Sequence, residues 1–234
     1  MATIERDALL ANLEGVRSDI AAACARSGRD PIEVTLVAAT KSVPVDAIAV
    51  AHGAGVTDFG ENYVQELRAK RPVAPDARWH FIGTLQSGSA HHVAALADVV
   101  QTLAGGHATD RLARRATEAG RRLDVLIEVD YTGERSGADP DDVGSLADRV
   151  VALDGLHLIG LMTVPPIGAD AEAARPTFVR LRALRDRIRE RHAEVVELSM
   201  GMSLDYQVAV EEGATMVRVG TALFGPRTSV PGRR

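Results

Sequence analysis

Eight short apolar runs recur along the chain, and a stretch of helical character separates each run from the next. The runs cover residues 34–40, 56–60, 79–83, 98–103, 123–130, 156–162, 195–199 and 215–219. The helical stretches are predicted near residues 44–53, 61–70, 88–96, 108–119, 140–152, 171–192 and 203–212. Strands that are apolar on both faces and alternate with helices are typical of a parallel sheet covered by helices. Eight such units predict a closed α/β barrel rather than an open, doubly wound sheet.

One further helix is predicted ahead of the first strand. From Ile4 to Ala25, apolar residues recur at intervals of three to four positions, which is the period of an amphipathic helix. No linker or low-complexity segment divides the chain. We therefore predict one domain over residues 1–225, a single (β/α)8 TIM barrel with an extra N-terminal helix. Residues 226–234 (PRTSVPGRR) are predicted to form a flexible tail.

Composition limits the classes of function that are open to this chain of 234 residues. A formal net charge of −5 provides no general attraction to nucleic acids or anionic membranes. No apolar run approaches the roughly 20 residues needed to cross a bilayer. The first residues, MATIERDALL, show no signal-peptide pattern, and the single cysteine, Cys24, is compatible with a reducing compartment. We therefore expect a cytoplasmic globular protein with no nucleic-acid or membrane partner.

Lysine is scarce, because the 27 basic residues comprise 25 arginines and two lysines, Lys41 and Lys70. Lys41 stands at the C-terminal tip of the first predicted strand, and in barrels of this kind the loops after the strands form the active site. A desolvated amine can act as a neutral nucleophile toward a carbonyl, which a guanidinium cannot do. We therefore interpret Lys41 as a candidate Schiff-base lysine. The alternative is a lysine whose stem lines the barrel and whose ammonium reaches water or a carboxylate.

Two loops rich in glycine and hydroxyl groups follow the last two predicted strands. The seventh strand leads into SMGMS, from Ser199 to Ser203, and the eighth leads into GTALFG, from Gly220 to Gly225. Glycine lets backbone N–H groups approach an anion, and barrels often bind phosphate with these two loops. Glycines at strand ends are also ordinary turn residues, and Ser203 is a predicted N-cap of the next helix. A Schiff-base lysine binds an aldehyde, and a phosphate site lies beside it. An aldehyde and a phosphate in one ligand indicate pyridoxal 5′-phosphate (PLP).

Arg218 lies near the end of the eighth predicted strand, next to this phosphate site. It is a candidate partner for the ring nitrogen of the cofactor, because proteins tune PLP through that contact. A cation there would disfavour protonation of the ring and weaken the ring as an electron sink, so transamination would be disfavoured. The alternative is an arginine that is ion-paired or at the surface.

Other polar clusters carry weaker signals. His91 and His92 are adjacent but lack companion ligands, so no metal site is predicted. Glu128 and Asp130 alternate on one face of a strand. We interpret them as solvated or hydrogen-bonded carboxylates at a strand end, with an acid–base pair as the alternative.

Six motifs in one order resemble a known family. They are TKSVP, FGENYVQE, WHFIGTLQS, GLMTVPP, ELSMGMS and MVRVGTALFG, and they run from residue 40 to residue 225. The chain is similar to the YggS/PROSC family of pyridoxal phosphate homeostasis proteins, whose members resemble the barrel domain of bacterial alanine racemases. The resemblance implies PLP as the cofactor, held as an internal aldimine on Lys41. It also implies a role in vitamin B6 and amino-acid homeostasis without robust catalytic turnover.

The resemblance assigns further residues to the cofactor site. The implied set is Lys41, Asn62, His80, Ser199, Met200, Arg218, Gly220 and Thr221. Arg218 would lie beside the pyridine nitrogen. The phosphate would be held by Ser199, Gly220 and Thr221. Asn62, His80 and Met200 would line the pocket.

The chain also departs from the family at several positions. An Asn-Lys pair is usual where this chain has Gly88 and Ser89, and a lysine is common where it has Arg135. Amides are common where it has Glu128 and Asp130. These departures leave the implied cofactor pocket intact, and they put in doubt any exchange or regulatory role of surface lysines.

Two enzyme classes remain as alternatives to a PLP-binding homeostasis protein. A PLP-dependent amino-acid racemase would use Lys41 and a second base such as His80. Alanine racemases take a tyrosine from an added C-terminal domain across a dimer, whereas nine residues follow Gly225 here and none is a tyrosine. We therefore expect a monomer that is not an enzyme, with PLP-dependent apo-enzymes as partners. The third candidate is a Schiff-base aldolase without a cofactor.

Overall fold

A closed barrel of eight parallel strands forms the centre of the computed structural model, which describes residues 5–166, 168 and 170–226. Each strand is hydrogen-bonded to the next in sequence, and β8 closes the barrel against β1. The strands are β1 (Thr35–Ala39), β2 (Asp58–Glu61), β3 (Arg78–Phe81), β4 (Val99–Leu103), β5 (Leu123–Glu128), β6 (Leu156–Met162), β7 (Glu197–Ser199) and β8 (Met216–Val219). All eight predicted strands and the predicted fold class are confirmed, with boundaries that differ by up to two residues.

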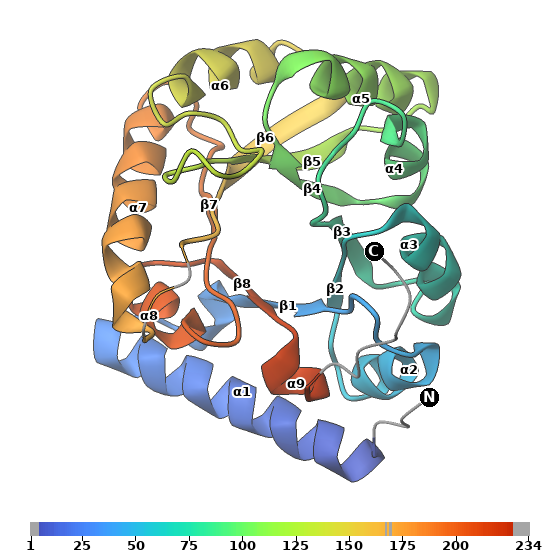
Figure 1. Cartoon of the computed structure of the whole chain (residues 1–234), viewed down its shortest axis with the longest axis vertical. Coiled ribbons are helices and arrows are strands. Elements are labelled where there is room, and N and C mark those ends of the chain that lie inside the picture. The colour runs from blue at the N-terminus through green and yellow to red at the C-terminus, as the bar shows by residue number, and fades with distance from the viewer. Residues whose placement is uncertain (1–4, 167, 169, 227–234) are drawn as a thin grey trace.

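Helices surround the barrel in a ring (Figure 1). Within the described residues they are α1 (Arg6–Ser27), α2 (Val45–Gly53), α3 (Val64–Lys70), α4 (Ala90–Leu96), α5 (Gly106–Glu118), α6 (Val143–Val151), α7 (Arg175–Arg189), α8 (Tyr206–Glu211) and α9 (Thr221–Phe224). Short 3-10 turns occupy Pro31–Glu33, Arg71–Val73 and Glu172–Ala174. Each predicted helical stretch contains a helix. The four-residue α9 follows β8 directly, in the loop where the sequence places an anion site.

The predicted N-terminal helix is present as α1, which runs along the outside of the ring (Figure 1). Its buried residues recur at helical spacing, and they include Leu9, Leu13, Val16 and Ile20. Burial of this apolar stripe against α8 and α9 explains why a long helix forms ahead of the first strand. The helix ends where Gly28 adopts a left-handed conformation with φ 69°, a common helix terminator.

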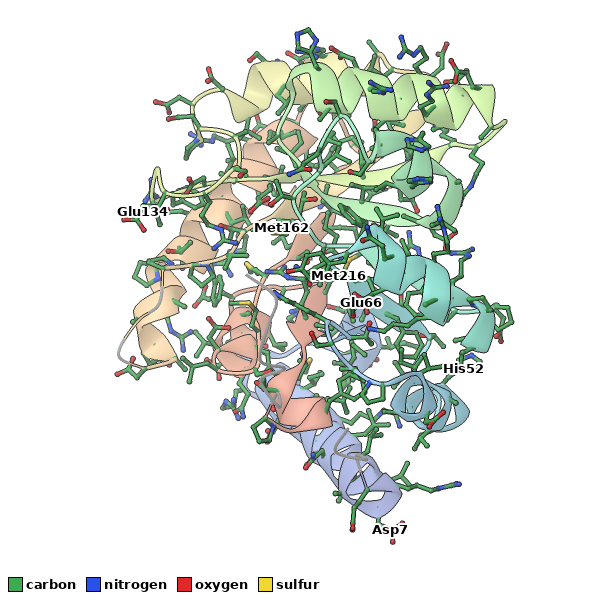
Figure 2. The ribbon with its side chains drawn as sticks, turned by 45° about the vertical axis from the view of Figure 1, so that its right-hand side comes forward. Asp7, His52, Glu66, Glu134, Met162 and Met216 are labelled. Carbon is green, nitrogen blue, oxygen red and sulfur yellow. The ribbon has the colours of Figure 1, made fainter. Side chains whose placement is uncertain are left out.

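The barrel interior contains an apolar cluster. It consists of Val37, Val99, Leu126, Ile159, Met162 and Met216. Met162 and Met216 lie within the barrel in Figure 2. Because successive residues of a strand point to opposite faces, Met216 and Arg218 share the inner face of β8. Arg218 lies two residues after Met216 on this strand, closer to the C-terminal end of the barrel. Its side chain is therefore placed above the apolar cluster.

Two predictions concern the ends of the chain and its relation to membranes. The predicted tail, residues 226–234, lies outside the described residues except for Pro226. The predicted helix start at Ile4 also lies outside them. In the part of the chain that the structure describes, no helix combines the length and apolar character needed to span a membrane.

Candidate functional site

A cavity of about 670 Å³ lies where the strands of the barrel end. Its volume falls within the roughly 300–1,000 Å³ that is usual for small-molecule sites. The wall contains five of the eight residues that the sequence implicates, which are Lys41, Asn62, Arg218, Gly220 and Thr221. The structure therefore brings residues from the two ends of the sequence around one space, because β1 and β8 are neighbours in the closed barrel.

Lys41 follows β1 in a turn, and its side chain is half-buried. Its Nζ atom lies 5.2 Å from the ring centroid of Tyr63, which is in the range of a cation–π contact. Tyr63 itself is 48% exposed. The amine is thus held at the edge of the cavity, between the loops that follow β1 and β2.

Arg218 is buried, yet it lines the cavity from β8, the strand next to β1. Its Nη1 atom donates to the carbonyl oxygen of Ser199 at 2.9 Å and to Ser199 Oγ at 2.7 Å. Its Nη2 atom donates to the carbonyl oxygen of Thr163 at 2.9 Å. Burial lowers the pKa of Arg218 to about 10, while Glu128 and Asp205 oppose this shift. The guanidinium is therefore still a cation at neutral pH.

Two backbone N–H groups converge on one oxygen at the start of α9. Gly220 N and Ala222 N donate to Ser203 Oγ at 3.2 and 3.1 Å. The prediction that Ser203 caps the following helix is wrong, because α8 begins at Tyr206 and Asp205 precedes it. The hydroxyl instead satisfies free N–H groups at the start of α9, which follows the next strand of the barrel, β8. This geometry shows that the cavity wall presents donors to a single acceptor position.

A chain of buried hydrogen bonds runs from Arg218 into the barrel, and we call it the interior chain. Ser199 Oγ, which accepts from Arg218, donates to Gln101 Oε1 at 2.7 Å. Gln101 Nε2 then faces His80 Nδ1 at 2.8 Å, and His80 Nε2 faces Asp58 Oδ1 at 2.9 Å. Each group donates to the next, so the interior chain joins a cation near the cavity to a carboxylate at the start of β2.

The interior chain explains why two predicted site residues do not line the cavity. His80 and Ser199 are completely buried, and their polar atoms are bonded within the barrel. Burial lowers the pKa of His80 despite the opposing effect of Asp58. The hydrogen bonds assign a neutral ring that accepts at Nδ1 and donates from Nε2. Met200, the third such residue, is completely buried in the main hydrophobic core.

Sequence reasoning missed two members of the interior chain, Gln101 and Asp58. Gln101 lies in β4, where every residue is buried. A single amide within an apolar strand was the available signal, because a buried amide needs partners. Asp58 carries a weaker signal, since a carboxylate at the start of a strand is also common at the surface.

Glu128 and Asp130 have different environments at the end of β5. Glu128 lines the cavity, and burial raises its pKa, while Arg135 and Arg218 oppose the shift. Arg135 Nε lies 3.5 Å from Glu128 Oε1. Burial would also raise the pKa of Asp130, but hydrogen bonds from Thr132 and Arg135 hold it below its ordinary value. Asp130 therefore organises the loop, whereas Glu128 adds a carboxyl group to the cavity.

The donor set fits a small aldehyde that carries an anionic group. Lys41 provides a primary amine, and Gly220 and Ala222 provide N–H groups that already hold an oxygen atom. Arg218 adds a positive charge on the same cavity. Among the described residues, no cluster of three or more His, Cys, Asp or Glu side chains is arranged to hold a metal ion.

Comparison with known proteins gives consistent matches over the chain. Residues 4–228 match the family model described as alanine racemase, N-terminal domain. The pyridoxal phosphate homeostasis protein of Aquifex aeolicus is 39% identical, with 92% of this chain and 96% of that protein covered. The pyridoxal phosphate homeostasis protein of Homo sapiens is 36% identical, with 92% of this chain and 85% of that protein covered.

Solved structures show the same relationship. PipY of Synechococcus elongatus with PLP bound has a TM-score of 0.83 and 34% identity, and the match covers 93% of this chain and 100% of that chain. An alanine racemase of Clostridium difficile has a TM-score of 0.76 but 16% identity, with 95% of this chain and 60% of that chain covered. The racemase therefore shares the barrel fold.

Proposed function

The chain belongs to the family of pyridoxal phosphate homeostasis proteins, and we propose that it binds PLP covalently through Lys41 and serves vitamin B6 and amino-acid homeostasis without robust turnover. The observation that carries this proposal is the cavity itself. Lys41, Arg218 and Gly220 line one space of about 670 Å³, and Ser203 on the same wall accepts from two converging backbone N–H groups. A relative of known structure, PipY, has been solved with PLP bound.

When bound, PLP supplies an aldehyde that condenses with a primary amine. Lys41 would provide that amine at the end of β1. The N–H groups of Gly220 and Ala222 would donate to a phosphate oxygen in place of Ser203 Oγ, with Thr221 beside them. Asn62 would contact the cofactor from the loop after β2, where it lines the cavity.

Arg218 would face the ring nitrogen of the cofactor. Its charge at neutral pH would disfavour protonation of that nitrogen, so the ring would be a weak electron sink. We propose that His80, Ser199 and Met200 act from below, where the first two hold Arg218 through the interior chain. This arrangement supports binding and release of the cofactor over chemistry on amino acids.

The alternative function, an amino-acid racemase, requires a second base near the substrate. His80 was the candidate for that base, but both of its ring nitrogens are bonded to Gln101 and Asp58 inside the barrel. A fully buried, doubly bonded imidazole is poorly placed to take a proton from a ligand in the cavity. Measurement of alanine racemisation by the purified, PLP-loaded protein tests this alternative directly.

The proposal extends to the state of the protein in the cell. We propose a single PLP-binding domain over residues 1–225 that acts as a cytoplasmic monomer and passes PLP to PLP-dependent apo-enzymes. The cavity lies at one end of the barrel, where the loops after the strands leave it accessible to ligands. Light scattering over a range of protein concentrations tests the monomer, and transfer to an apo-enzyme across a dialysis membrane tests whether contact is required.

A reduction experiment tests covalent binding through Lys41. The protein is incubated with PLP, reduced with borohydride and digested, and the labelled peptide is identified by mass spectrometry. We expect the label on Lys41, and we expect Lys41→Ala to remain folded by circular dichroism but to take up no label. Because the chain has two lysines, Lys70 is an internal control. Label on Lys70 or the N-terminus, with Lys41 unmodified, would overturn the proposal.

A further inference from the structure

The second lysine of the chain, Lys70, is buried beneath the loop that carries Lys41. Lys70 ends α3, and it is 4% exposed. Its Nζ atom donates to the carbonyl oxygen of Thr40 and to Glu66 Oε2, both at 2.6 Å, and it forms an ion pair with Glu61 Oε1. An ammonium group has three N–H donors, so these three oxygens use all of them. We call Lys70, Glu61 and Glu66 the ionic triad.

The two carboxylates of the ionic triad hold the residues on either side of Lys41. Glu61 Oε1 accepts from Thr40 Oγ1 at 2.6 Å. Glu66 Oε2 accepts from the backbone N–H of Ser42 at 2.8 Å. With the direct bond from Lys70 to the Thr40 carbonyl, both neighbours of Lys41 are therefore fastened to the same ionic group.

The backbone after Lys41 needs such support. Ser42 has φ 62°, and among the described residues it is the one non-glycine residue with a positive φ. A residue other than glycine keeps this conformation only where the surrounding structure imposes it, and such positions cluster at functional sites. In this loop, the Ser42 N–H bond to Glu66 supplies a direct constraint. Figure 2 shows Glu66 on the side of α3 that faces the barrel.

We propose that Lys70 is a positioning residue for Lys41, which it acts on through Thr40, Glu61 and Glu66. This inference rests on the proposed function, because it assigns a purpose to the geometry of the lysine that captures PLP. The charge of Lys70 balances two carboxylates that would otherwise repel each other below the loop.

The identity of the residue follows from the same contacts. A compact ammonium can direct three donors toward three separate oxygens, whereas the planar guanidinium of arginine presents its donors in a rigid fork. This requirement explains why a chain with 25 arginines keeps a lysine at position 70. Both lysines of the chain then serve the same site: Lys41 reacts with PLP, and Lys70 fixes the position of Lys41.

The test is the rate at which PLP attaches covalently, followed by the visible absorbance of the adduct. We expect Lys70→Met to attach PLP about tenfold more slowly or worse, because loss of rigid placement slows a reaction between oriented groups. Lys70→Arg should not restore the rate. Thr40→Val keeps the shape of the side chain but removes its bond to Glu61, and it should also slow attachment.

A matched control separates positioning from general loss of stability. Leu112 is completely buried in α5, which is not among the elements that line the cavity. Leu112→Ala should lower the melting temperature but leave the attachment rate unchanged at a temperature where every variant is folded. If Lys70→Met does not fold, Thr40→Val and Leu112→Ala form the deciding pair.

Two failures are distinguishable in this experiment. If the wild type acquires no label on Lys41, the proposed function fails. If the wild type is labelled on Lys41 but Lys70→Met and Thr40→Val attach PLP at its rate, the positioning role fails alone. With Lys70→Met unfolded, a wild-type rate for Thr40→Val overturns the positioning role in the same way.

Discussion

Replacement of Gln101 by leucine should break the interior chain at its centre. Leucine has nearly the same volume as glutamine but cannot accept from Ser199 Oγ or donate to His80 Nδ1. Both groups are completely buried, so neither can turn to water. Gln101 is therefore the position at which a single substitution leaves one buried donor and one buried acceptor without partners.

The size of the effect follows from these two losses. Each unsatisfied buried group costs about 1–3 kcal/mol, and the gain from burying an apolar side chain offsets part of the sum. Two such groups together cost about 2–6 kcal/mol, and after the apolar offset we expect the free energy of unfolding to fall by about 3 kcal/mol. For a chain of this size, about 2–4 °C is lost per kcal/mol, so the melting temperature should fall by about 6–12 °C.

The chain supplies its own probe for the assay. Trp79 is the single tryptophan. It is completely buried, and its ring stacks on Phe59 with 5.2 Å between the centroids. Urea unfolding followed by its fluorescence gives the free energy of unfolding of each variant. Gln86→Leu is the matched control, because Gln86 is exposed and the chemical change is identical.

The expected result is a large loss for Gln101→Leu and a change within about 0.5 kcal/mol for Gln86→Leu. PLP affinity should fall in Gln101→Leu as well, because Ser199 would be free to turn and Arg218 would lose a fixed acceptor. A stability of Gln101→Leu equal to that of the wild type would refute the reasoning, since it would mean that the buried partners do not depend on the amide.

Two further predictions concern pH. Burial raises the pKa of Glu128, so the cavity gains a negative charge as the pH rises through that pKa and should bind anionic PLP less well. Binding titrations at several pH values should show this fall in PLP affinity. A Glu128→Gln variant that shows the same fall would contradict the assignment to Glu128. Burial lowers the pKa of His80, so the unfolded state binds a proton first as the pH falls below about 6.5, and stability should decrease by at most about 1.4 kcal/mol per pH unit. The pH slope of the His80→Gln variant in urea unfolding is subtracted from that of the wild type, which leaves the contribution of His80 and its partner Asp58 because titrating groups remote from His80 cancel. Equal slopes would show that His80 does not titrate as described.

Local patterns in the sequence were sufficient for the fold and for the position of Lys41. Apolar runs of strand length, separated by helical periodicity, identify the strands and their order, since a parallel strand buried on both faces has few alternatives. The location of Lys41 follows directly, because the end of β1 is an end of the barrel. Gly220 and Thr221 follow β8 in the same way, so the cavity wall at both strands could be predicted.

Side chains that act from within the barrel required the tertiary structure. The sequence places His80 near the end of a strand, where the site is predicted. In the structure its ring points into the barrel and forms hydrogen bonds with Asp58 and Gln101. Ser199 and Gln101 are 98 positions apart and come from β7 and β4. Such a contact depends on the tilt and stagger of strands in the closed barrel, and no local pattern carries that information.

The same division applies to the two lysines. The sequence alone determined that an amine, rather than a guanidinium, stands at the end of the first strand, because one residue and its place in a regular pattern are enough for that inference. Only the tertiary structure decided that Lys70 lies under the loop of Lys41 with Glu61 and Glu66. A buried ammonium is stable only where several oxygens surround it, and those oxygens come from separate segments that folding brings together.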